Sequence, residues 1–396
     1  MYYFLFWTGM VSICFAGSYK TIKTPKAPRL SVIEKNGQLS LKSIPEKNVA
    51  HKDAVSYAFK KIIIPRNTKK IRFKVRSTIK NNRKGFLGSI FLGENKYLLN
   101  AHEAGFWIES TSWNEITIPL HQFVRNQKPW NVKRMDGTKT SVDTVKVTHL
   151  GFGRGFQNHH YNIPNYAFDI KDIEFIEEDQ QQKLKITKGI AKSCSKIKNG
   201  KHLKVLLLGD SITYLGKGKS HFYHALKQIE IPDSKFDVAN MAISGHSVRG
   251  GSIVLARSLA AMPDPDLVII MYGANDCKSV SLNSGFSSVV FESQLEHFLH
   301  HINRLTKGKS EFILLNGVPR INIKSKKSEG SVEKLSPAYE NLSKKYSLPL
   351  CDTMSAYLEM SPESKAKYYR DSVHQNQRGL EFIGKHIAKT LLKNLR

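Results

Sequence analysis

The sequence predicts two domains of different fold class, an N-terminal all-β sandwich and a C-terminal α/β domain whose parallel sheet is covered by helices on both faces. The chain of 396 residues is long enough for two domains of ordinary size. Apolar and polar residues alternate in the first half, whereas short apolar runs separated by helical stretches follow in the second. Hydrophobic residues make up 40% and charged residues 24% of the chain, which is a globular composition.

The chain begins with an uncharged and mostly apolar segment, residues 1–17, which ends in Ala16 and Gly17. This segment is shorter than most transmembrane helices, but its length and its small terminal residues are typical of a secretory signal peptide. No later apolar run approaches the roughly 20 residues that span a bilayer. We therefore expect export to the periplasm or the extracellular space, without an integral membrane span.

Alternation with a period of two predicts a β-sandwich over residues 31–178. Ile71, Phe73 and Val75 alternate with basic residues, so that one face of this strand is apolar and the other is charged. Turn residues such as Gly93 separate the predicted strands. Further strands are expected at residues 88–92, 113–118, 143–150 and 167–176.

The composition changes at residues 179–202. Three glutamines are followed by seven lysines between Lys183 and Lys201, and large apolar residues are few. Such a segment is typical of a linker, so we expect residues 179–202 to connect the two domains as a basic linker.

From residue 203 to residue 396 the pattern becomes an alternation of strands and helices. The apolar strands are expected at residues 203–208, 236–240, 267–272, 312–315 and 348–350, with helices near 219–229, 249–261, 289–306, 332–346 and 376–394. Continuous apolar strands separated by helices indicate a parallel sheet that is buried on both faces.

A candidate nucleophile and a candidate base occur in this second domain. The first apolar strand leads directly into Gly209, Asp210 and Ser211, and functional residues of open α/β sheets gather at the carboxyl ends of strands. Asp371 precedes His374 by three residues, a spacing that lets the carboxylate orient the imidazole. Together these residues supply a Ser–His–Asp system in the chain order Ser, Asp, His.

Two further residues could stabilise an oxyanion. Gly245 follows the second strand and can present an exposed backbone N–H, and Asn275 follows the third strand and carries a side-chain amide. Donors that are held in place for a developing negative charge typically contribute 10²–10³ in rate.

These four pieces, in this order, resemble the SGNH/GDSL hydrolase superfamily. Its four blocks match at Gly209-Asp210-Ser211, at Gly245, at Gly273-Ala274-Asn275-Asp276 and at residues 371–374, and the resemblance covers about residues 203–394. It implies a three-layer α/β/α domain that transfers acyl groups through a covalent ester on Ser211, without a metal or cofactor. It also implies an oxyanion hole formed by the N–H groups of Ser211 and Gly245 and by the amide of Asn275.

The first domain resembles the jelly-roll modules that bind carbohydrate. A strand begins at Trp113 and continues through Ile118-Pro119-Leu120 to Phe123, another ends in Gly151-Phe152, and a third closes the domain at residues 167–175. Such modules stack sugars on aromatic rings. The candidate sugar-binding residues near loops are Trp107, Trp130, Tyr161 and Tyr166, although aromatic residues of a sandwich more often belong to its core.

The charge is strongly positive, with 61 Lys and Arg against 33 Asp and Glu and a net charge of +28. This balance favours an anionic polymer as partner, with Arg249 as a candidate subsite cation, but the lysines could equally be solvated surface. No motif of a nucleic-acid-binding protein occurs, so nucleic acid is not expected. Metal-ligand spacing of His and Cys is likewise absent.

The sequence thus predicts an exported serine esterase that removes acyl groups, expected to be acetyl, from a polysaccharide. A lipase, a thioesterase and a sulfate-ester hydrolase have the same fold and remain alternatives, as does a non-catalytic polysaccharide-binding protein.

Overall fold

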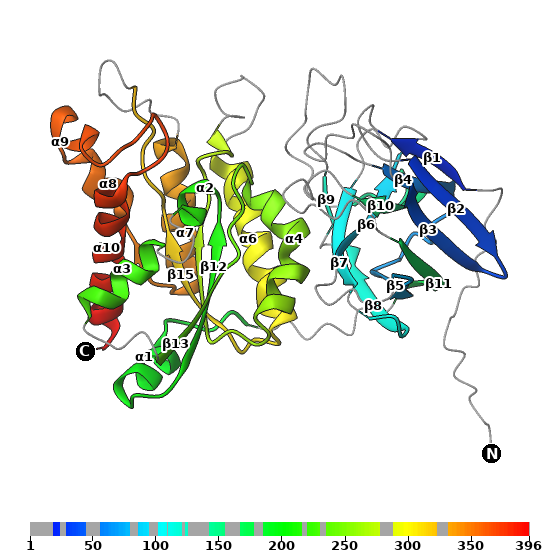
Figure 1. The fold of residues 1–396 in the computed structure, drawn as a ribbon, viewed down its shortest axis with the longest axis horizontal. Helices are drawn as coiled ribbons and strands as arrows, with labels where there is room; N and C mark the ends of the chain where they lie inside the picture. The colour runs from blue at the N-terminus through cyan, green and yellow to red at the C-terminus, as the bar shows by residue number, and fades with distance from the viewer. Residues whose placement is uncertain are drawn as a thin grey trace. The chain divides into compact units, whose positions relative to one another are not determined.

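The computed structural model describes residues 19–23, 29–44, 56–79, 86–94, 102–108, 110–120, 123–125, 142–154, 167–177, 185–215, 220–229, 235–277, 288–322 and 332–395. Contacts between Cα atoms divide the chain into two compact units, which we call the β unit (residues 1–132 and 139–181) and the α/β unit (residues 133–138 and 182–396). Both predicted fold classes are confirmed (Figure 1).

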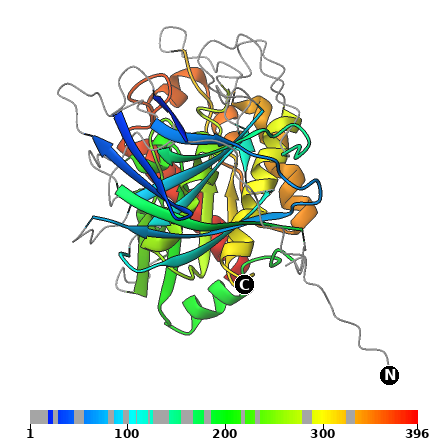
Figure 2. The same cartoon turned by 90° about the vertical axis from the view of Figure 1, so that its right-hand side faces the viewer.

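The β unit consists of two antiparallel sheets, seen from two directions in Figures 1 and 2. The six-stranded sheet has the order β1 (Lys20–Lys23), β4 (Ser56–Lys61), β10 (His149–Arg154), β6 (Phe86–Gly93), β7 (His102–Ile108) and β9 (Val124–Arg125). The five-stranded sheet has the order β2 (Arg29–Lys35), β3 (Gln38–Ile44), β11 (Ala167–Ile176), β5 (Lys70–Ser77) and β8 (Asn114–Pro119).

The core of the β unit forms from the inward-facing residues of both sheets. Burial alternates along β5, where Ile71, Phe73 and Val75 are buried and the basic residues between them are not. The ring of Phe73 meets those of Phe106 from β7 and Phe152 from β10 edge to face, at centroid distances of 5.1 and 5.4 Å. Alternation along strands such as β5 and β3 therefore contributes to one apolar interior, as the sequence pattern predicts.

One predicted strand is shorter than expected. Residues 144–146 form a turn, and strand β10 begins only at His149. The side chain of Asp143 accepts the N–H of Val145 at 3.2 Å, and its carbonyl accepts the N–H of Lys146 at 3.0 Å. These local hydrogen bonds compete with strand pairing, so the prediction of a strand over the whole of 143–150 is wrong in its first part.

The α/β unit has a parallel five-stranded sheet in the order β13 (Phe236–Asn240), β12 (Leu203–Gly209), β14 (Leu267–Met271), β15 (Glu311–Leu315) and β16 (Leu350–Cys351). Figure 1 shows α4 (Val248–Ala261) and α6 (Ser288–Leu305) on one face of this sheet, and α3 (His221–Gln228) and α10 (Gln377–Leu395) on the other. The remaining helical elements are α1 (Ala191–Lys198), α2 (Ser211–Tyr214), η5 (Glu333–Leu335), α7 (Ser336–Tyr346), α8 (Thr353–Leu358) and α9 (Pro362–Ala366).

Each strand of this sheet contributes to two hydrophobic clusters. In β12, Leu206 and Leu208 pack with α4, α6 and α7, whereas Val205 and Leu207 pack with α3 and α10. Because both faces of the sheet are covered, alternation disappears and the strand is apolar throughout. This arrangement leaves the carboxyl ends of the strands as the edge at which loops carry polar residues.

The predicted linker is the main difference between expectation and structure. Residues 191–198 form helix α1, and Ile190 and Cys194 are buried in the core of the α/β unit. The buried carboxylate of Glu311 on β15 accepts the N–H groups of Lys192 and Ser193 at 2.9 and 2.7 Å, which satisfies the start of this helix. The second half of residues 179–202 is therefore part of the α/β unit rather than a linker.

The predicted signal peptide, residues 1–17, lies outside the described residues. Of the helices in the described part of the chain, none combines the length and apolarity needed to cross a bilayer.

Candidate active site

The candidate nucleophile lies in a tight turn between β12 and α2. Ser211 is the first residue of α2, and the side chain of Asp210 caps this helix by accepting the N–H of Ile212 at 3.0 Å. Gly209 is required by close packing, because a Cβ at this position would lie 2.4 Å from the Thr213 Oγ1 and 2.5 Å from the Met271 carbonyl oxygen. The turn therefore holds the Ser211 hydroxyl at the carboxyl edge of the sheet.

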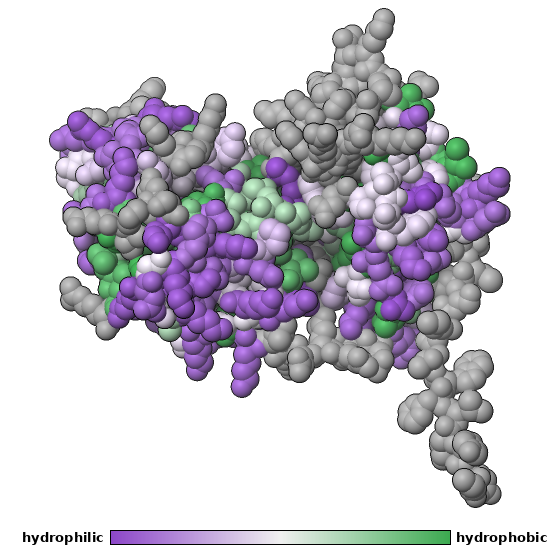
Figure 3. Space-filling model, turned by 60° about the horizontal axis from the view of Figure 1, so that its bottom comes forward, coloured by the Kyte–Doolittle hydropathy of each residue, from purple (hydrophilic) through white to green (hydrophobic). Residues whose placement is uncertain are grey.

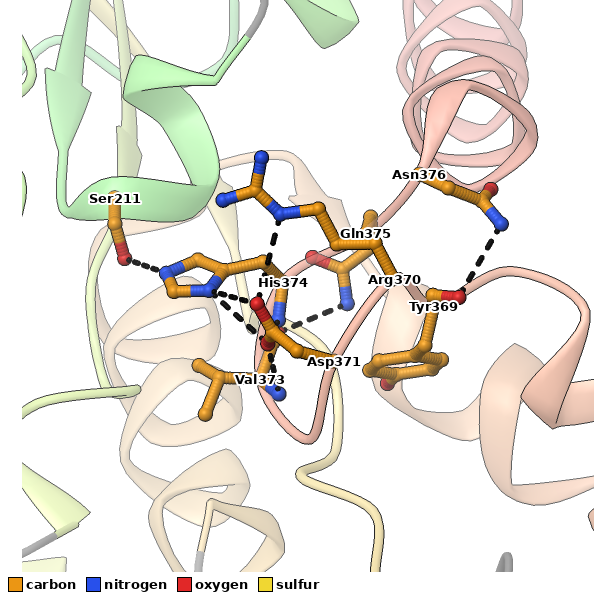
Figure 4. Close-up of polar contacts among 8 residues, drawn as sticks. All are labelled: Ser211, Tyr369, Arg370, Asp371, Val373, His374, Gln375 and Asn376. Carbon is orange, nitrogen blue, oxygen red and sulfur yellow. Dashed lines mark hydrogen bonds and ion pairs between the residues drawn. The ribbon is translucent and has the colours of Figure 1, made fainter. Parts of the chain in front are cut away.

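The histidine and the aspartate approach this serine from the loop before α10. Figure 4 shows the imidazole of His374 between the Ser211 hydroxyl on one side and the Asp371 carboxylate on the other. The His374 Nε2 lies 2.9 Å from the Ser211 Oγ, and its Nδ1 lies 2.8 Å from the Asp371 Oδ2. In this arrangement Nδ1–H donates to the carboxylate and Nε2 can accept the serine proton.

The Asp371 carboxylate is held in its ionised form. Its Oδ1 also accepts the backbone N–H groups of Val373 and His374 at 2.9 and 2.8 Å. Partial burial raises the pKa of this group, but the two N–H donors and the His374 ring outweigh burial and lower the pKa to about 2. A permanent negative charge beside Nδ1 stabilises the imidazolium that forms when His374 takes a proton.

The loop that carries this pair is fixed by its own hydrogen bonds. The N–H of Arg370 donates to the His374 carbonyl at 3.0 Å, and the N–H of Ile321 donates to the Ser372 carbonyl at 3.0 Å. The Asn376 amide donates to the Tyr369 carbonyl at 3.3 Å, as drawn in Figure 4. These contacts hold the loop before any substrate binds.

The two candidate oxyanion donors lie on turns that are tied to the nucleophile turn. The N–H of Ile243 donates to the Gly209 carbonyl at 3.0 Å, and Gly245, two residues further, is exposed with a φ of 82°. The Asn275 amide donates to the His246 carbonyl at 3.1 Å. A side-chain amide has two N–H groups, so this bond orients Asn275 while a second donor remains for an oxyanion.

Two buried aspartates that sequence reasoning did not single out as functional hold these turns together. Asp210 accepts the N–H of Ala274 at 3.3 Å, and Asp276 accepts the N–H groups of Val248 and Gly273 at 3.1 Å each. Burial raises the pKa of Asp276 to about 7, with the nearby Asp210 charge acting in the same direction and the Val248 N–H opposing it. Their position inside the Gly-Asp-Ser and Gly-Ala-Asn-Asp motifs is the signal that could have identified them.

Of the predicted substrate-binding residues, the structure describes only Arg249 and Trp107. The Arg249 side chain, in the first turn of α4, is only 3% exposed, and its role as a subsite cation stays a prediction. Trp107 is half-buried on β7. Trp130, Tyr161 and Tyr166 lie outside the described residues. Among the residues that the structure describes, no group of three or more His, Cys, Asp or Glu side chains could hold a metal ion.

Comparison with known proteins gives a family match over the same part of the chain. Residues 207–381 match the model of the GDSL-like Lipase/Acylhydrolase family. This segment contains the candidate triad and both candidate oxyanion residues. A search of curated proteins finds no match.

Several solved structures are similar over about half of this chain. The acetyl xylan esterase AlAXEase is 22% identical and covers 47% of this chain and 98% of its own, with a TM-score of 0.40. An acetylxylan esterase from Geobacillus stearothermophilus is 19% identical and covers 50% and 96%, with a TM-score of 0.40. The lipase/acylhydrolase from Enterococcus faecalis is 23% identical and covers 47% and 94%, with a TM-score of 0.38.

Proposed function

Because residues 207–381 belong to the GDSL-like lipase/acylhydrolase family, we propose that this protein is an exported serine esterase that removes acetyl groups from a polysaccharide. The observation that carries the proposal is the hydrogen-bond chain from the Ser211 hydroxyl through His374 to Asp371, at 2.9 and 2.8 Å. All three residues lie within the matched segment. They supply the nucleophile, the base and the group orienting the base that hydrolysis through a covalent ester needs.

The geometry accounts for each step of such a reaction. Ser211 attacks the ester carbonyl carbon while His374 Nε2 takes the hydroxyl proton. The carbonyl oxygen becomes an oxyanion that the N–H groups of Ser211 and Gly245 and the Asn275 amide would bind. His374 then returns the proton to the leaving alcohol as its bond to the acyl carbon breaks, and water hydrolyses the acyl-enzyme by the same route in reverse.

A polysaccharide is the favoured substrate class for two reasons. The chain joins the hydrolase to a β-sandwich whose sequence resembles carbohydrate-binding jelly rolls, a pairing that suits a polymeric substrate. The residues after the Asn275 motif, 277–290, are rich in Ser and lack the long apolar lid that a lipase would use to cover lipid. The predicted signal peptide would bring the enzyme to polysaccharide outside the cytoplasm.

Release of acetate from a panel of acetylated polysaccharides tests the proposal. We expect the wild-type protein to release acetate from at least one of them, and Ser211→Ala to lose this activity together with hydrolysis of a small aryl acetate. A phosphonate reagent should label wild type and fail to label the variant. Hydrolysis of only long-chain lipid esters or thioesters would overturn the substrate class, and an active Ser211→Ala variant would overturn the mechanism.

A further inference from the structure

We propose that the α/β unit has a second, non-catalytic site that binds an anionic sugar residue of a polymer. The site is a cavity of about 560 Å³ between α10 and the turn that leads from α7 into β16. Its size lies within the range of natural ligand sites. That the anion belongs to a sugar rests on the proposed function, whereas the cavity and its charges do not.

The cavity is separate from the candidate active site. Its lining residues on α10 include His386 and Lys393, which lie roughly 14 and 24 Å along the helix axis from Gln377, the first residue of α10. The candidate active site is at the opposite end of this helix, because His374, which contacts Ser211, precedes Gln377 by three residues. The cavity borders β16, the last strand of the sheet, whose outer side has no neighbouring strand in the described part of the chain.

The walls of the cavity are fixed by hydrogen bonds. The N–H of Leu348 donates to the Ser343 carbonyl at 2.9 Å, and the Ser343 hydroxyl donates back to the Leu348 carbonyl at 2.7 Å. The N–H of Gly189 donates to the Ser347 carbonyl at 2.9 Å and ties a second segment to the same turn. A ligand would therefore enter a preformed site and lose little free energy in ordering it.

The charge of the lining favours an anion. His386, Lys389 and Lys393 recur at intervals of three and four residues, so α10 presents them on one face. Among the described residues, neither lysine forms an ion pair. His386 Nδ1–H donates to the Phe382 carbonyl at 2.9 Å, so its position over the cavity is fixed.

The single carboxylate of the lining is already occupied by protein donors. Asp352 accepts the Asn316 amide at 2.6 Å and the N–H of Ser355 at 3.0 Å. Partial burial raises its pKa, but these donors outweigh burial and lower it. Asp352 therefore stays ionised and also interacts with His386, so the lining carries two lysine charges against one negative charge and is positive on balance.

The rest of the lining suits a sugar better than a bare anion. The polar residues Ser343, Ser347 and Asn394 line the cavity together with the apolar residues Leu348 and Pro349. A hydroxylated ring with a carboxylate or sulfate has both kinds of surface, whereas an inorganic anion would leave most of the volume unused. Figure 3 shows one face of the α/β unit, on the left, on which hydrophilic side chains predominate.

A second site of this kind would increase the hydrolysis of polymers but not of small esters. A chain that is held at the cavity has a high effective concentration near Ser211, even if the active site itself binds the polymer weakly. Small esters cannot occupy both sites, so their hydrolysis is independent of the cavity.

Binding can be tested without turnover in full-length Ser211→Ala protein. Isothermal titration with an oligogalacturonate hexamer and with an uncharged xylo-oligosaccharide of equal length should give binding of the charged ligand only. Reversal of both cavity lysines, Lys389→Glu with Lys393→Glu, should weaken this binding by about tenfold or more. The matched control reverses two exposed lysines outside the lining, Lys344 and Lys385, and should retain it.

Three results would overturn the second site. These are an equal loss of binding in both double variants, no binding of the charged hexamer at low salt, and competition by inorganic sulfate with the same affinity as the hexamer. In an active background, both double variants should keep the wild-type kcat on a small aryl acetate. Because binding is measured in a catalytically inactive protein, loss of the proposed esterase function and loss of the second site give different results.

Discussion

The carboxylate of Asp210 accepts the backbone N–H of Ala274 at 3.3 Å, across 64 residues of sequence. This contact joins the turn that carries Ser211 to the turn that carries Asn275. The same carboxylate caps α2 through the N–H of Ile212. The nucleophile and a candidate oxyanion donor are thus positioned by one buried side chain.

Asp210→Ala should therefore impair catalysis although Asp210 does not touch the substrate. Loss of both hydrogen bonds leaves two buried N–H groups without this acceptor, at a cost of about 1–3 kcal/mol each. The displaced turns should lower kcat on an aryl acetate by roughly 10² with a smaller change in KM. Ser361→Ala, which removes the cap of α9, is the matched control and should leave kcat unchanged. A stability loss without a kcat loss would make Asp210 purely structural.

Asn275→Ala should lower kcat by about 10²–10³ and leave KM nearly unchanged, because an oxyanion donor acts on the transition state. Steady-state kinetics on an aryl acetate separate the two parameters. Asn199→Ala removes an exposed amide at the end of α1 and provides the control. If KM rises while kcat stays constant, Asn275 binds the substrate ground state instead.

Asp371→Asn should reduce kcat by roughly 10⁴, because the amide stabilises the wrong tautomer of His374. The wild-type pKa of Asp371 is lowered to about 2, so its carboxylate is ionised throughout the working range and its negative charge is lost only as the pH falls through about 2. The loss of kcat/KM at acidic pH must therefore come from the protonation of another group. Arg370→Gln removes only a partly exposed ion pair at 3.5 Å and should change activity little. A limb that disappears in Asp371→Asn would contradict this assignment.

Asp276 should make the α/β unit less stable at high pH. Burial raises its folded-state pKa to about 7 from the ordinary 3.8, so the folded protein binds the extra proton and the associated stability is lost as the pH rises through 7. The free energy of unfolding of Asp276→Asn relative to wild type should increase from pH 5 to pH 8, as measured by urea denaturation. Asp264→Asn, at an exposed carboxylate, should show no such change. A pH-independent difference would contradict the pKa of about 7.

A fragment of residues 182–396 should be soluble and hydrolyse small esters like the full chain, since this unit contains its own core and the whole candidate site. A fragment of residues 203–396 should unfold at lower temperature. It lacks Ile190, whose burial contributes about 1.5–3 kcal/mol, and it leaves the buried Glu311 without its N–H donors. Calorimetry of the two fragments makes the comparison, and equal melting temperatures would show that α1 is dispensable.

Motif position explains why much of the candidate site could be predicted from sequence. Ser211, Gly245 and Asn275 each follow an apolar strand, and the carboxyl ends of parallel strands meet at one edge, so their proximity follows from topology. The Asp371–His374 pair is close in sequence and needs no long-range knowledge. The burial of Arg249 could not be predicted, because a basic residue in a helical pattern gives no sign of which neighbours cover it.

The misassigned elements also have physical causes. Helix α1 has the composition of a linker, because three of its eight residues are lysines and only Ser193 and Cys194 are buried. Strand β7 is not among the expected strands, and its first two residues do not alternate, since His102 and Glu103 are both buried, at 5% and 0% exposure. Pairing partners such as β3 and β11 are set by tertiary contacts that a single strand's pattern does not encode.

The central place of β11 between β3 and β5 has a consequence for biosynthesis. This strand, Ala167–Ile176, is the last of the β unit to leave the ribosome, yet it joins the two parts of the five-stranded sheet. Until it emerges, β2 and β3 on one side and β5 and β8 on the other expose unpaired edges, which are prone to aggregation. A nascent chain arrested before residue 167 is thus expected to bind chaperones and to be sensitive to protease, whereas one extended beyond the β unit should be protected.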